Sequence, residues 1–491
     1  MSMKSNSSHN LLLINPWIFD FTAFDLWSKP IGLLYIASFL RELGYQINFI
    51  DCLDKHHPGL QSESKGRKIK IKIFGTGPFP RQIVAKPDIL DFVPRHFSRY
   101  GLSEDIFVEE LKNCPPPAAI LVTSFMTYWY MGPKRVVELC REIFPEAPII
   151  LGGIYASLMP QHARDVIKPD FIVTGPGEIQ SMELLSSIIS HPPAITKRFD
   201  SLDDFPRPAL DLYTQLDYLP IMTSRGCPYR CTFCATDKIS GSYAQRSPES
   251  VFGELSENVK RFNVKDIAFY DDALLLNKNQ RLIPILKKVI SSKMKLRLHT
   301  PNGLHTKQID KEVAQLFRLS GFTTIRLSFE TKNPKRFADM KNKVTPDDLI
   351  QAVENLEKAG YARNALETYI LMGLPGQSFE EIYESILFAH SLGIKVRLAS
   401  FSPIPGTIDH DRAVKQGLYP KDADPLLSNK TIYPLHRSIE AFHKFHQIRQ
   451  LVHVLNQAVD REVNLFEPAE LKLAFQKIVQ SPEENEKSKK L

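Results

Sequence analysis

Three of the six cysteines stand within one short stretch, "CPYRCTFC", at Cys227, Cys231 and Cys234. The other three, at positions 52, 114 and 140, are scattered singly, and an odd cluster of thiols argues against structural disulfides. A structural zinc site is disfavoured as well, because such sites close with four ligands and no second CxxC pair or HxxxH follows the stretch. Three thiolates on an iron-sulfur cluster would leave one metal position open, and an open position is typical of a catalytic metal site.

This CxxxCxxC spacing, with Phe233 directly before the last cysteine, resembles the radical S-adenosylmethionine (radical SAM) superfamily. The resemblance implies that Cys227, Cys231 and Cys234 hold a [4Fe–4S] cluster whose open iron binds S-adenosylmethionine (SAM). It also implies that the reduced cluster cleaves SAM to a 5'-deoxyadenosyl radical and that Phe233 lines the adenine. A flavodoxin- or ferredoxin-type protein is the electron donor that the resemblance suggests.

The bulk composition is that of an ordinary globular protein, with 491 residues, 43% hydrophobic and 24% charged. No apolar run is long enough for a membrane span or a signal peptide, and few, mostly isolated cysteines predict a reducing, cytoplasmic location. Much of the net charge of +7 stands in "SKGRKIKIKIFG", residues 64–75. The alternation of Lys and Ile there predicts an edge strand with one wet face. Nucleic-acid binding is not expected, because no aromatic residues are interleaved with the charge.

The first part of the chain alternates short apolar strands with helices. Strands are expected at "LLLINP", "QINFIDC", "AAILVTSFMTYWY", "APIILGGIYAS" and "PDFIVTGPGE", helices at "KPIGLLYIASFLRELGY" and "GPKRVVELCREIF", and an irregular insertion at 54–117. This order predicts an α/β fold with a Rossmann-like parallel sheet that has helices on both faces. Ligands bind at the carboxyl ends of such strands, where the sequence has Asn15, Thr123, Ser124, Gly152, Gly153, Gly175 and Glu178. The alternative, that these glycines only make tight turns, stays open.

This half resembles the cobalamin-binding domain that precedes the barrel in one branch of the radical SAM superfamily. The likeness covers about residues 11–180 and rests on "KPIGLLYIASFLRELGY", "IILGGIYAS" and "VTGPGE". It implies bound cobalamin, with the strand-end residues as its contacts. Asp54, His56 and Gly59 fit the DxHxxG pattern of proteins that place a histidine below cobalt, but the pattern follows the second strand and enters a polar loop. We therefore interpret it as a coincidence and expect no protein histidine on cobalt.

A second series of strands and helices follows the Pro-rich stretch "SLDDFPRPALDLY". Six strands, each with a helix after it, are expected from "IMTSRG" to "IKVRLASFSPIPGT", which predicts a partial (β/α)6 TIM-type barrel with its site at the carboxyl ends of the strands. The likeness to the radical SAM core covers residues 219–410. The predicted organisation is a disordered N-terminus 1–10, a cobalamin-binding-like Rossmann domain 11–199, a linker 200–218, the barrel 219–410, a helical C-terminal region 411–480 and a disordered tail 481–491.

Polar residues follow several of the barrel strands. Asp271 and Asp272 end the second strand, where they are candidates for general acid and base, although one of them capping the next helix is an equal alternative. Arg326, Ser328 and Glu330 follow at two-residue steps on the fourth strand, so we expect them on one face.

The family resemblance gives these fourth-strand residues a role at the ribose and carboxylate of SAM, with Glu330 as the strongest catalytic candidate. An Arg326–Glu330 ion pair inside the barrel is the alternative. In "LMGLPGQ", Gly373 and Gly376 resemble the family's adenine motif, but Gln377 stands where an acidic residue is usual.

Together the residues and the resemblance predict a radical SAM enzyme that attacks an unactivated C–H bond of a small molecule. Cobalamin-dependent methyl transfer is the favoured outcome. Two alternatives stay open: ring formation or rearrangement without methyl transfer, and a non-catalytic cobalamin or redox sensor. A nucleic-acid methylthiotransferase would need three more clustered cysteines in the N-terminal half and a small C-terminal β domain, and the sequence predicts neither.

Overall fold

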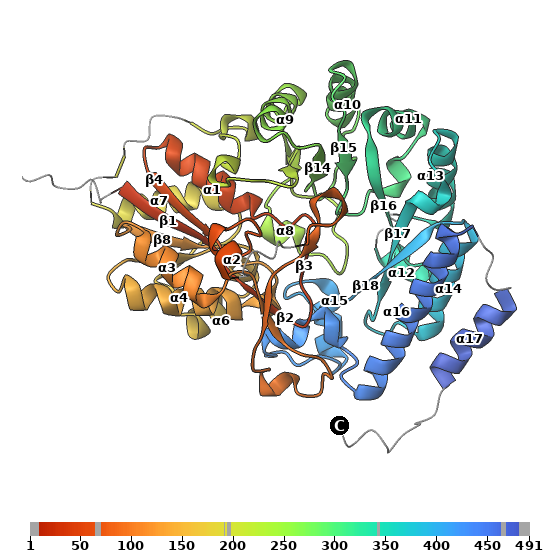
Figure 1. Cartoon of the computed structure of the whole chain (residues 1–491). Coiled ribbons are helices and arrows are strands. Elements are labelled where there is room, and N and C mark those ends of the chain that lie inside the picture. Colours follow the sequence, from red (N-terminus) through yellow and green to blue (C-terminus); the bar gives the residue numbers. More distant parts are fainter. Residues whose placement is uncertain are drawn as a thin grey trace, which may run out of the picture.

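The computed structural model describes residues 9–63, 70–190, 192–193, 198–340, 344–462 and 468–480. The predicted disordered tail at 481–491 and the first eight residues lie outside this range, and Asn10 already begins the first strand. Two parallel sheets dominate the chain, one in each half (Figure 1).

The first sheet has five parallel strands in the order β10-β9-β8-β1-β4. Their bounds are β1 (Asn10–Asn15), β4 (Gln46–Asp51), β8 (Ala119–Val122), β9 (Ile149–Leu151) and β10 (Phe171–Ile172). β1 and β8 are neighbours although they are distant in sequence, so the strand order reverses there, and a crevice opens at such a point in doubly wound sheets.

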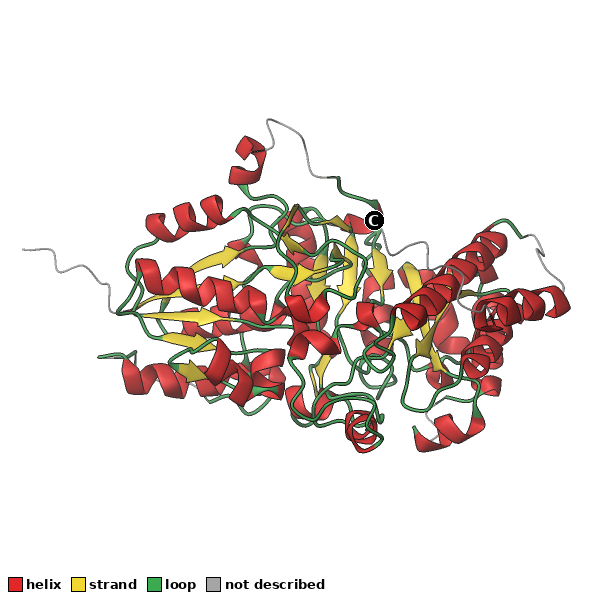
Figure 2. Ribbon diagram, turned by 90° about the horizontal axis from the view of Figure 1, so that it is seen from below, coloured by secondary structure: helices red, strands yellow, loops and turns green. Residues whose placement is uncertain are grey.

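Both faces of this sheet are covered by helices, as Figure 2 shows from below. Leu11 and Leu13 of β1 pack with Phe39 of α1 (Ile31–Glu42) and with α7 (Gly177–Ile188). Leu12 and Ile14 point the other way, into the core that contains α3 (Glu104–Asn113) and α4 (Met131–Ile143). All six residues of β1 are buried. The expected Rossmann-like sheet with helices on both faces is therefore confirmed.

The second sheet has six parallel strands in chain order. They are β11 (Leu219–Ile221), β14 (Asp266–Phe269), β15 (Arg297–His299), β16 (Phe322–Glu330), β17 (Leu366–Met372) and β18 (Lys395–Ser400). The connecting helices are α9 (Pro248–Phe262), α10 (Leu282–Ser291), α11 (Lys311–Ser320), α12 (Pro334–Asp339), α13 (Pro346–Lys358) and α14 (Phe379–Ser391). This arrangement confirms the predicted partial TIM-type barrel.

The insertion after β4 is more regular than its sequence suggests. Besides α2 (Pro58–Glu63) and α3 it contributes strands to two small antiparallel sheets, β2 (Ile18–Asp20) with β7 (Ser98–Tyr100) and β6 (Arg81–Ile83), and β3 (Phe24–Asp25) with β5 (Gly77–Pro78). The predicted Lys/Ile edge strand is wrong for the part that is described. Residues 70–72 are irregular, and Ile73–Gly75 form a 3-10 turn. Ile71 and Ile73 are exposed and pair with no strand among the described residues, so neither side-chain burial nor strand pairing holds this segment extended.

The C-terminal region returns to the N-terminal half. After α15 (Ile408–Lys415), the segment 424–429 contacts it at three points: Tyr130 OH donates to Asp424 Oδ2 at 3.2 Å, the Thr127 and Ser428 hydroxyls lie 3.0 Å apart, and Asn429 Nδ2 donates to Asp20 Oδ1 at 2.9 Å. We call this segment the C-terminal strap. It is followed by α16 (Ile439–Asp460), which packs on β18 and α14, and by α17 (Pro468–Gln480).

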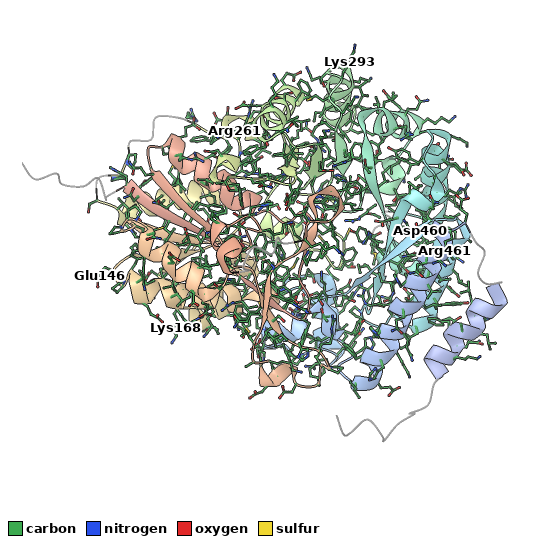
Figure 3. All side chains as sticks on the ribbon, in the orientation of Figure 1. Glu146, Lys168, Arg261, Lys293, Asp460 and Arg461 are labelled. Carbon is green, nitrogen blue, oxygen red and sulfur yellow. The ribbon has the colours of Figure 1, made fainter. Side chains whose placement is uncertain are left out.

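Short helices complete the description: α5 (Ile154–Leu158), α6 (Pro160–Val166) and α8 (Thr236–Ile239). In Figure 3 the labelled charged side chains Glu146, Lys168, Arg261 and Lys293 lie on the outer surface. None of the described helices is both long and apolar enough to cross a membrane.

Candidate active site

The three clustered cysteines lie on one loop at the carboxyl end of β11. The loop is carried by a hairpin of two short strands, β12 (Ser224–Arg225) and β13 (Ala244–Gln245), which we call the cysteine hairpin. Cys231 is buried, while Cys227 and Cys234 are partly exposed. Across the described residues, no group of three or more His, Cys, Asp or Glu side chains is gathered closely enough to hold a metal ion. The donor set fits an iron-sulfur cluster by chemistry, and ligation by these thiols stays a prediction.

Asp271, at the end of β14, holds the start of this loop. Its carboxylate accepts hydrogen bonds from the Thr223 N–H at 3.0 Å, from the Thr223 hydroxyl at 2.6 Å and from the Ser224 hydroxyl at 2.7 Å. It also pairs with Arg281 at 2.9 Å, and both side chains are completely buried. With these partners around it, the carboxylate is suited to positioning the loop and poorly placed to exchange protons with a substrate.

Asp272 has a different environment, although it is the next residue. Its side chain opens into the large cavity described below. Desolvation by the surrounding protein, followed by the charge of Asp271, raises the pKa of the Asp272 carboxyl to about 6, against hydrogen bonds from the Gly226 N–H and the Ser240 side chain. Of the two predicted carboxylates, Asp272 is therefore the one that can take up or release a proton near neutral pH.

A small, closed pocket with almost no free volume joins the cysteine loop to the end of β16. It is lined by Cys231, Phe233, Phe329, Glu330, Phe337, Met340 and Val344. Phe233 and Glu330, which the family resemblance associates with adenine and ribose, thus share one pocket beside Cys231. Glu330 has a φ of +66°, a conformation that costs about 1 to 3 kcal/mol for a residue with a side chain and is often found at functional sites.

The β16–β17 register shifts between Ser328 and Glu330. The alternation of side chains between the two faces of the strand, which would place Glu330 on the face of Arg326 and Ser328, therefore stops before Glu330. Arg326 Nε donates to Glu367 Oε2 at 3.1 Å, and its guanidinium carbon lies 5.4 Å from the Trp27 ring centroid. Ser328 is buried against the 301–304 segment, where its backbone N–H donates to Leu304 O at 2.9 Å. Arg326 and Ser328 therefore do not line the pocket of Phe233 and Glu330.

Gly373 and Gly376 form the turn after β17, with φ values of +88° and +65°. Gln377 holds this turn: its Oε1 accepts from the N–H groups of Gly373 at 2.8 Å and Leu374 at 3.1 Å, and its Nε2 donates to Leu371 O at 3.0 Å. The glutamine that departs from the family's motif is thus a structural part of the turn. Neither glycine lines the pocket of Phe233 and Glu330.

A cavity of about 530 Å³ lies between the two halves. Six of the seven predicted strand-end residues line it: Thr123, Ser124, Gly152, Gly153, Gly175 and Glu178. The barrel side contributes Met222, Arg225, Ile239, Ser240, Tyr270, Asp272 and Asn302. Asn15 does not reach the cavity; it is buried, and its Nδ2 donates to Asp51 Oδ1 at 2.6 Å.

The two adjacent glycines in this wall have different reasons to be glycine. A Cβ at Gly153 would lie 2.3 Å from Ser124 O, so Gly153 is required for a close backbone approach at a φ of +93°. A Cβ at Gly152 would have only Val173 O nearby, at 3.7 Å. The tight-turn interpretation therefore holds for Gly153, whereas Gly152 leaves space on the cavity wall.

The cavity also has lining residues that the sequence reasoning missed. Trp27, Met126 and Trp129 come from irregular segments and a 3-10 turn that no motif marks, and Tyr35 comes from α1, where the landmark stretch at 29–45 did not single it out. Trp27 has a φ of +62° and stacks on His299 at 4.7 Å. Arg225 could have been selected from the sequence as a candidate site residue, since it stands two residues before Cys227.

No histidine is among the described residues that line the cavity. His56 of the DxHxxG pattern points elsewhere: its Nε2 lies 2.9 Å from Asp217 Oδ2. Although His56 stands in a polar stretch of the sequence, it is largely buried in this pair and is not a solvated loop residue.

Comparison with known proteins shows which family the part of the chain with these features resembles. Residues 221–389 match the radical SAM superfamily, a range that runs from the end of β11 into α14 and includes all three clustered cysteines and Glu330. This part of the chain is a radical SAM domain. As a radical SAM enzyme, it uses a [4Fe–4S] cluster and SAM, acts on a small molecule and needs a reductant.

Several curated proteins are similar to this radical SAM chain over most of their length. An uncharacterized methyltransferase of Pyrococcus horikoshii is 26% identical over 353 residues, 65% of this chain and 74% of the relative. The cytidylyl-2-hydroxyethylphosphonate methyltransferase of Streptomyces wedmorensis is 23% identical, over 79% of this chain and 78% of the relative. The anaerobic magnesium-protoporphyrin IX monomethyl ester cyclase of Rubrivivax gelatinosus is 23% identical over 59% of this chain and 56% of the relative.

Two solved structures share the fold of both halves. The radical SAM methyltransferase TsrM from Kitasatospora setae, solved with cobalamin and a [4Fe–4S] cluster, aligns with a TM-score of 0.61 at 17% identity, over 84% of this chain and 76% of TsrM. The cobalamin-dependent SAM radical enzyme OxsB aligns with a TM-score of 0.53 at 16% identity, over 93% of this chain and 62% of OxsB. The arrangement of a Rossmann-like sheet before a radical SAM barrel is thus a known one.

Proposed function

We propose that this radical SAM enzyme binds cobalamin between its two halves and transfers a methyl group to an unactivated carbon of a small molecule. The observation that carries the proposal is the cavity, because it brings the strand ends of the first sheet and Asp272 of the barrel to one space. Ligands of doubly wound sheets bind at this edge, and active sites of TIM-type barrels lie at theirs. Two methyltransferases among the similar proteins add support.

The cavity walls fit a large, flat cofactor. On the side of the first sheet they include small residues, Gly32, Ser124, Gly152 and Gly175, beside larger ones such as Tyr35 and Trp129, and a Cβ at Gly32 would meet nothing within 4 Å. The small residues would hold cobalamin by close backbone approach. With no histidine among the described lining residues, we infer that no protein histidine binds the cobalt.

At the barrel end, we propose that Cys227, Cys231 and Cys234 hold the cluster, and that Phe233 and Glu330 contact the adenosine of SAM. The cluster and one SAM would supply the radical, and bound cobalamin would supply the methyl group, taken from a second SAM. Phe233 offers an apolar face, and Glu330 offers two carboxylate oxygens that accept hydrogen bonds from hydroxyl groups. Their shared pocket beside Cys231 supports this role.

The remaining cavity residues exclude water and position the substrate. Trp27, Met222 and Tyr270 form an apolar wall at the barrel end, and such a wall shields a reactive carbon radical from solvent. The Asp272 carboxyl, with its pKa of about 6, holds or releases a proton at this wall. We propose it as the substrate-facing acid or base, and Asp271 as its structural neighbour.

Two further predictions accompany this proposal. The division into a cobalamin-binding-like domain at 11–199, a linker at 200–218, a barrel at 219–410 and a helical region at 411–480 is supported by the positions of the two sheets. The reductant is proposed to be a flavodoxin or ferredoxin, because the cluster needs single electrons at low potential.

The experiment that tests this proposal follows an isotope label from the methyl group of SAM into the product. The reconstituted, reduced enzyme is incubated with a cell extract, cobalamin and SAM that carries a trideuterated methyl group. Methyl transfer predicts 5'-deoxyadenosine together with a small molecule that has gained the label. Deoxyadenosine without labelled product favours ring formation or rearrangement, for which the similarity to the cyclase is the support. Absence of deoxyadenosine favours the sensor.

A further inference from the structure

The turn that follows β10 in the first half lies directly against the cysteine hairpin of the second. A Cβ at Gly175 would lie 3.9 Å from Ile239 O, and a Cβ at Gly241 would lie 3.6 Å from Pro176 Cγ. Glu178 Oε1 is 2.6 Å from Arg225 NH1. The predicted cofactor turn "VTGPGE" and the loop with the cluster ligands thus share an interface with no element between them (Figure 1, around α8).

The Glu178–Arg225 ion pair is the polar centre of this interface. The side chains are 6% and 18% exposed, and the guanidinium carbon lies 4.6 Å from the ring centroid of Tyr35 on α1. Removing one partner of a buried ion pair leaves the other charge desolvated, so the two side chains must move together. A displacement of Glu178 is therefore transmitted to Arg225.

Arg225 is rigidly connected to the first cluster ligand. Its backbone pairs with Ala244 in the hairpin, and only Gly226 separates it from Cys227. Gly226 is closely packed, because a Cβ there would lie 3.2 Å from Gly241 O and 3.3 Å from Ser242 O, at a φ of +78°. The backbone between Arg225 and Cys227 therefore has little room to absorb a shift of Arg225.

Glu178 and Arg225 both line the large cavity, so a molecule that fills the cavity contacts the pair. We propose that Arg225 is a positioning residue that couples occupancy of the cavity to the geometry of the cysteine loop. The inference rests on the proposed function, in which the cavity holds cobalamin and the loop holds the cluster. Because coupling between two binding sites is reciprocal, the cluster must change the affinity for cobalamin by the factor by which cobalamin changes cluster binding.

The test measures this factor in the full chain. The Kd for hydroxocobalamin is determined by absorbance, under anaerobic conditions, for cluster-loaded and cluster-free protein. We expect the two values to differ by about fivefold or more, the lower end of measured couplings. Glu178→Gln should bring the ratio close to one. Any direct contact that the glutamine loses affects both states equally and cancels in the ratio.

Asp211→Asn is the matched control. It neutralises a carboxylate that pairs with Arg41 at 2.7 Å, on the linker and α1, without contact to the cysteine hairpin. We expect the ratio of this variant to equal that of the wild type. Arg225→Lys keeps the positive charge but lacks the planar guanidinium group, which can bind a carboxylate with two N–H groups, so it should retain only part of the coupling.

A second measurement does not depend on any variant. Hydrogen exchange of the amides in 224–246 should slow when hydroxocobalamin is added to cluster-free wild type. A ratio of one in the wild type, or unchanged exchange in the hairpin, overturns the inference while cobalamin binding itself stands. A chain that loads a cluster but binds no hydroxocobalamin overturns the proposed function as well, so the two failures are distinguishable.

Discussion

Asp409 holds Thr232 by two hydrogen bonds. Its Oδ2 accepts from the Thr232 hydroxyl at 2.7 Å, and its backbone N–H donates to Thr232 O at 2.9 Å. Thr232 stands between Cys231 and Phe233, and Asp409 is the second residue of α15. Both residues are buried. The middle of the cysteine loop is thus fixed to the helix that follows the last barrel strand.

This contact predicts that Thr232→Val lowers the yield of cluster on reconstitution, because valine keeps the volume but leaves the buried Asp409 carboxylate with one partner fewer, at a cost of about 1 to 3 kcal/mol. Thr232→Ser keeps the hydroxyl and should restore the yield. Iron and sulfide content per chain is the measurement. Equal yields for Thr232→Val and Thr232→Ser would contradict a role of the hydrogen bond.

The ligand assignment predicts that Cys227→Ala, Cys231→Ala and Cys234→Ala each prevent cluster assembly, since each removes one of three thiolates on the loop. Cys114→Ala is the matched control, because Cys114 is also partly exposed but lies at the end of α3. Absorbance and electron paramagnetic resonance of the reduced cluster report the outcome. Loss of the cluster in Cys114→Ala would show that the assignment is wrong.

Glu330→Gln should keep the cluster and weaken SAM binding by about 1 to 3 kcal/mol, the scale for hydrogen bonds to a charged acceptor. Isothermal titration of cluster-loaded protein with SAM measures the change. Glu357→Gln, on the surface of α13, is the control and should leave the affinity unaltered. Unchanged SAM affinity and unchanged cleavage in Glu330→Gln would remove Glu330 from the site.

The positive φ of Glu330 gives a separate prediction. Glu330→Gly relieves the backbone strain, so the free energy of unfolding should rise by about 1 kcal/mol even though SAM binding falls. Urea denaturation of the apoprotein measures stability without cofactors. A large loss of stability in Glu330→Gly would mean that side-chain packing, and not strain, dominates at this position.

Asp272 predicts a pH dependence of stability. Its pKa of about 6 in the folded protein lies above the ordinary value of 3.8, so folding favours the protonated carboxyl. Its contribution to stability is present in full below about pH 4 and is lost as the pH rises through about 6. Relative to Asp272→Asn, the wild type should therefore become less stable between about pH 4 and 7. A constant difference between the two urea midpoints over this range would contradict the raised pKa.

The cavity wall predicts that Gly152→Leu prevents cobalamin binding while the protein stays folded and loads its cluster, because the leucine has space only on the cavity side. Gly153→Leu should instead unfold the first half, since its Cβ would meet Ser124 O.

His56→Ala should leave the spectrum of bound cobalamin unchanged. A nitrogen-split cob(II)alamin signal that disappears in His56→Ala would contradict the absence of a histidine ligand.

The strands and helices of both sheets could be predicted because apolar periodicity is a local property. β1 contains a continuous apolar run and is buried throughout, and α1 shows a helical period, so each is recognisable within a dozen residues. The insertion has no such period: its small sheets pair Ile18 with Tyr100 and Phe24 with Pro78, across distances that no local pattern records.

The site residues divide in the same way. The thiols and Phe233 are readable because their spacing is short. Asp271 and Asp272 are identical in sequence terms, yet only the fold directs one to Arg281 and the other to the cavity. The φ of Glu330 and the Glu178–Arg225 pair depend on backbone and tertiary context, which a single sequence does not display.

The C-terminal strap has a consequence for synthesis of the chain. Trp129, in the cavity wall, donates to Asp20 at 2.7 Å, and the other oxygen of Asp20 accepts from Asn429. Thr127 and its partner Ser428 are 301 residues apart, a stretch that a ribosome needs about 15 to 60 s to translate. Until then Asp20 and Thr127 lack these partners. The nascent N-terminal half therefore completes these contacts, which lie beside the cavity-lining Trp129, only after residue 429 has been synthesised.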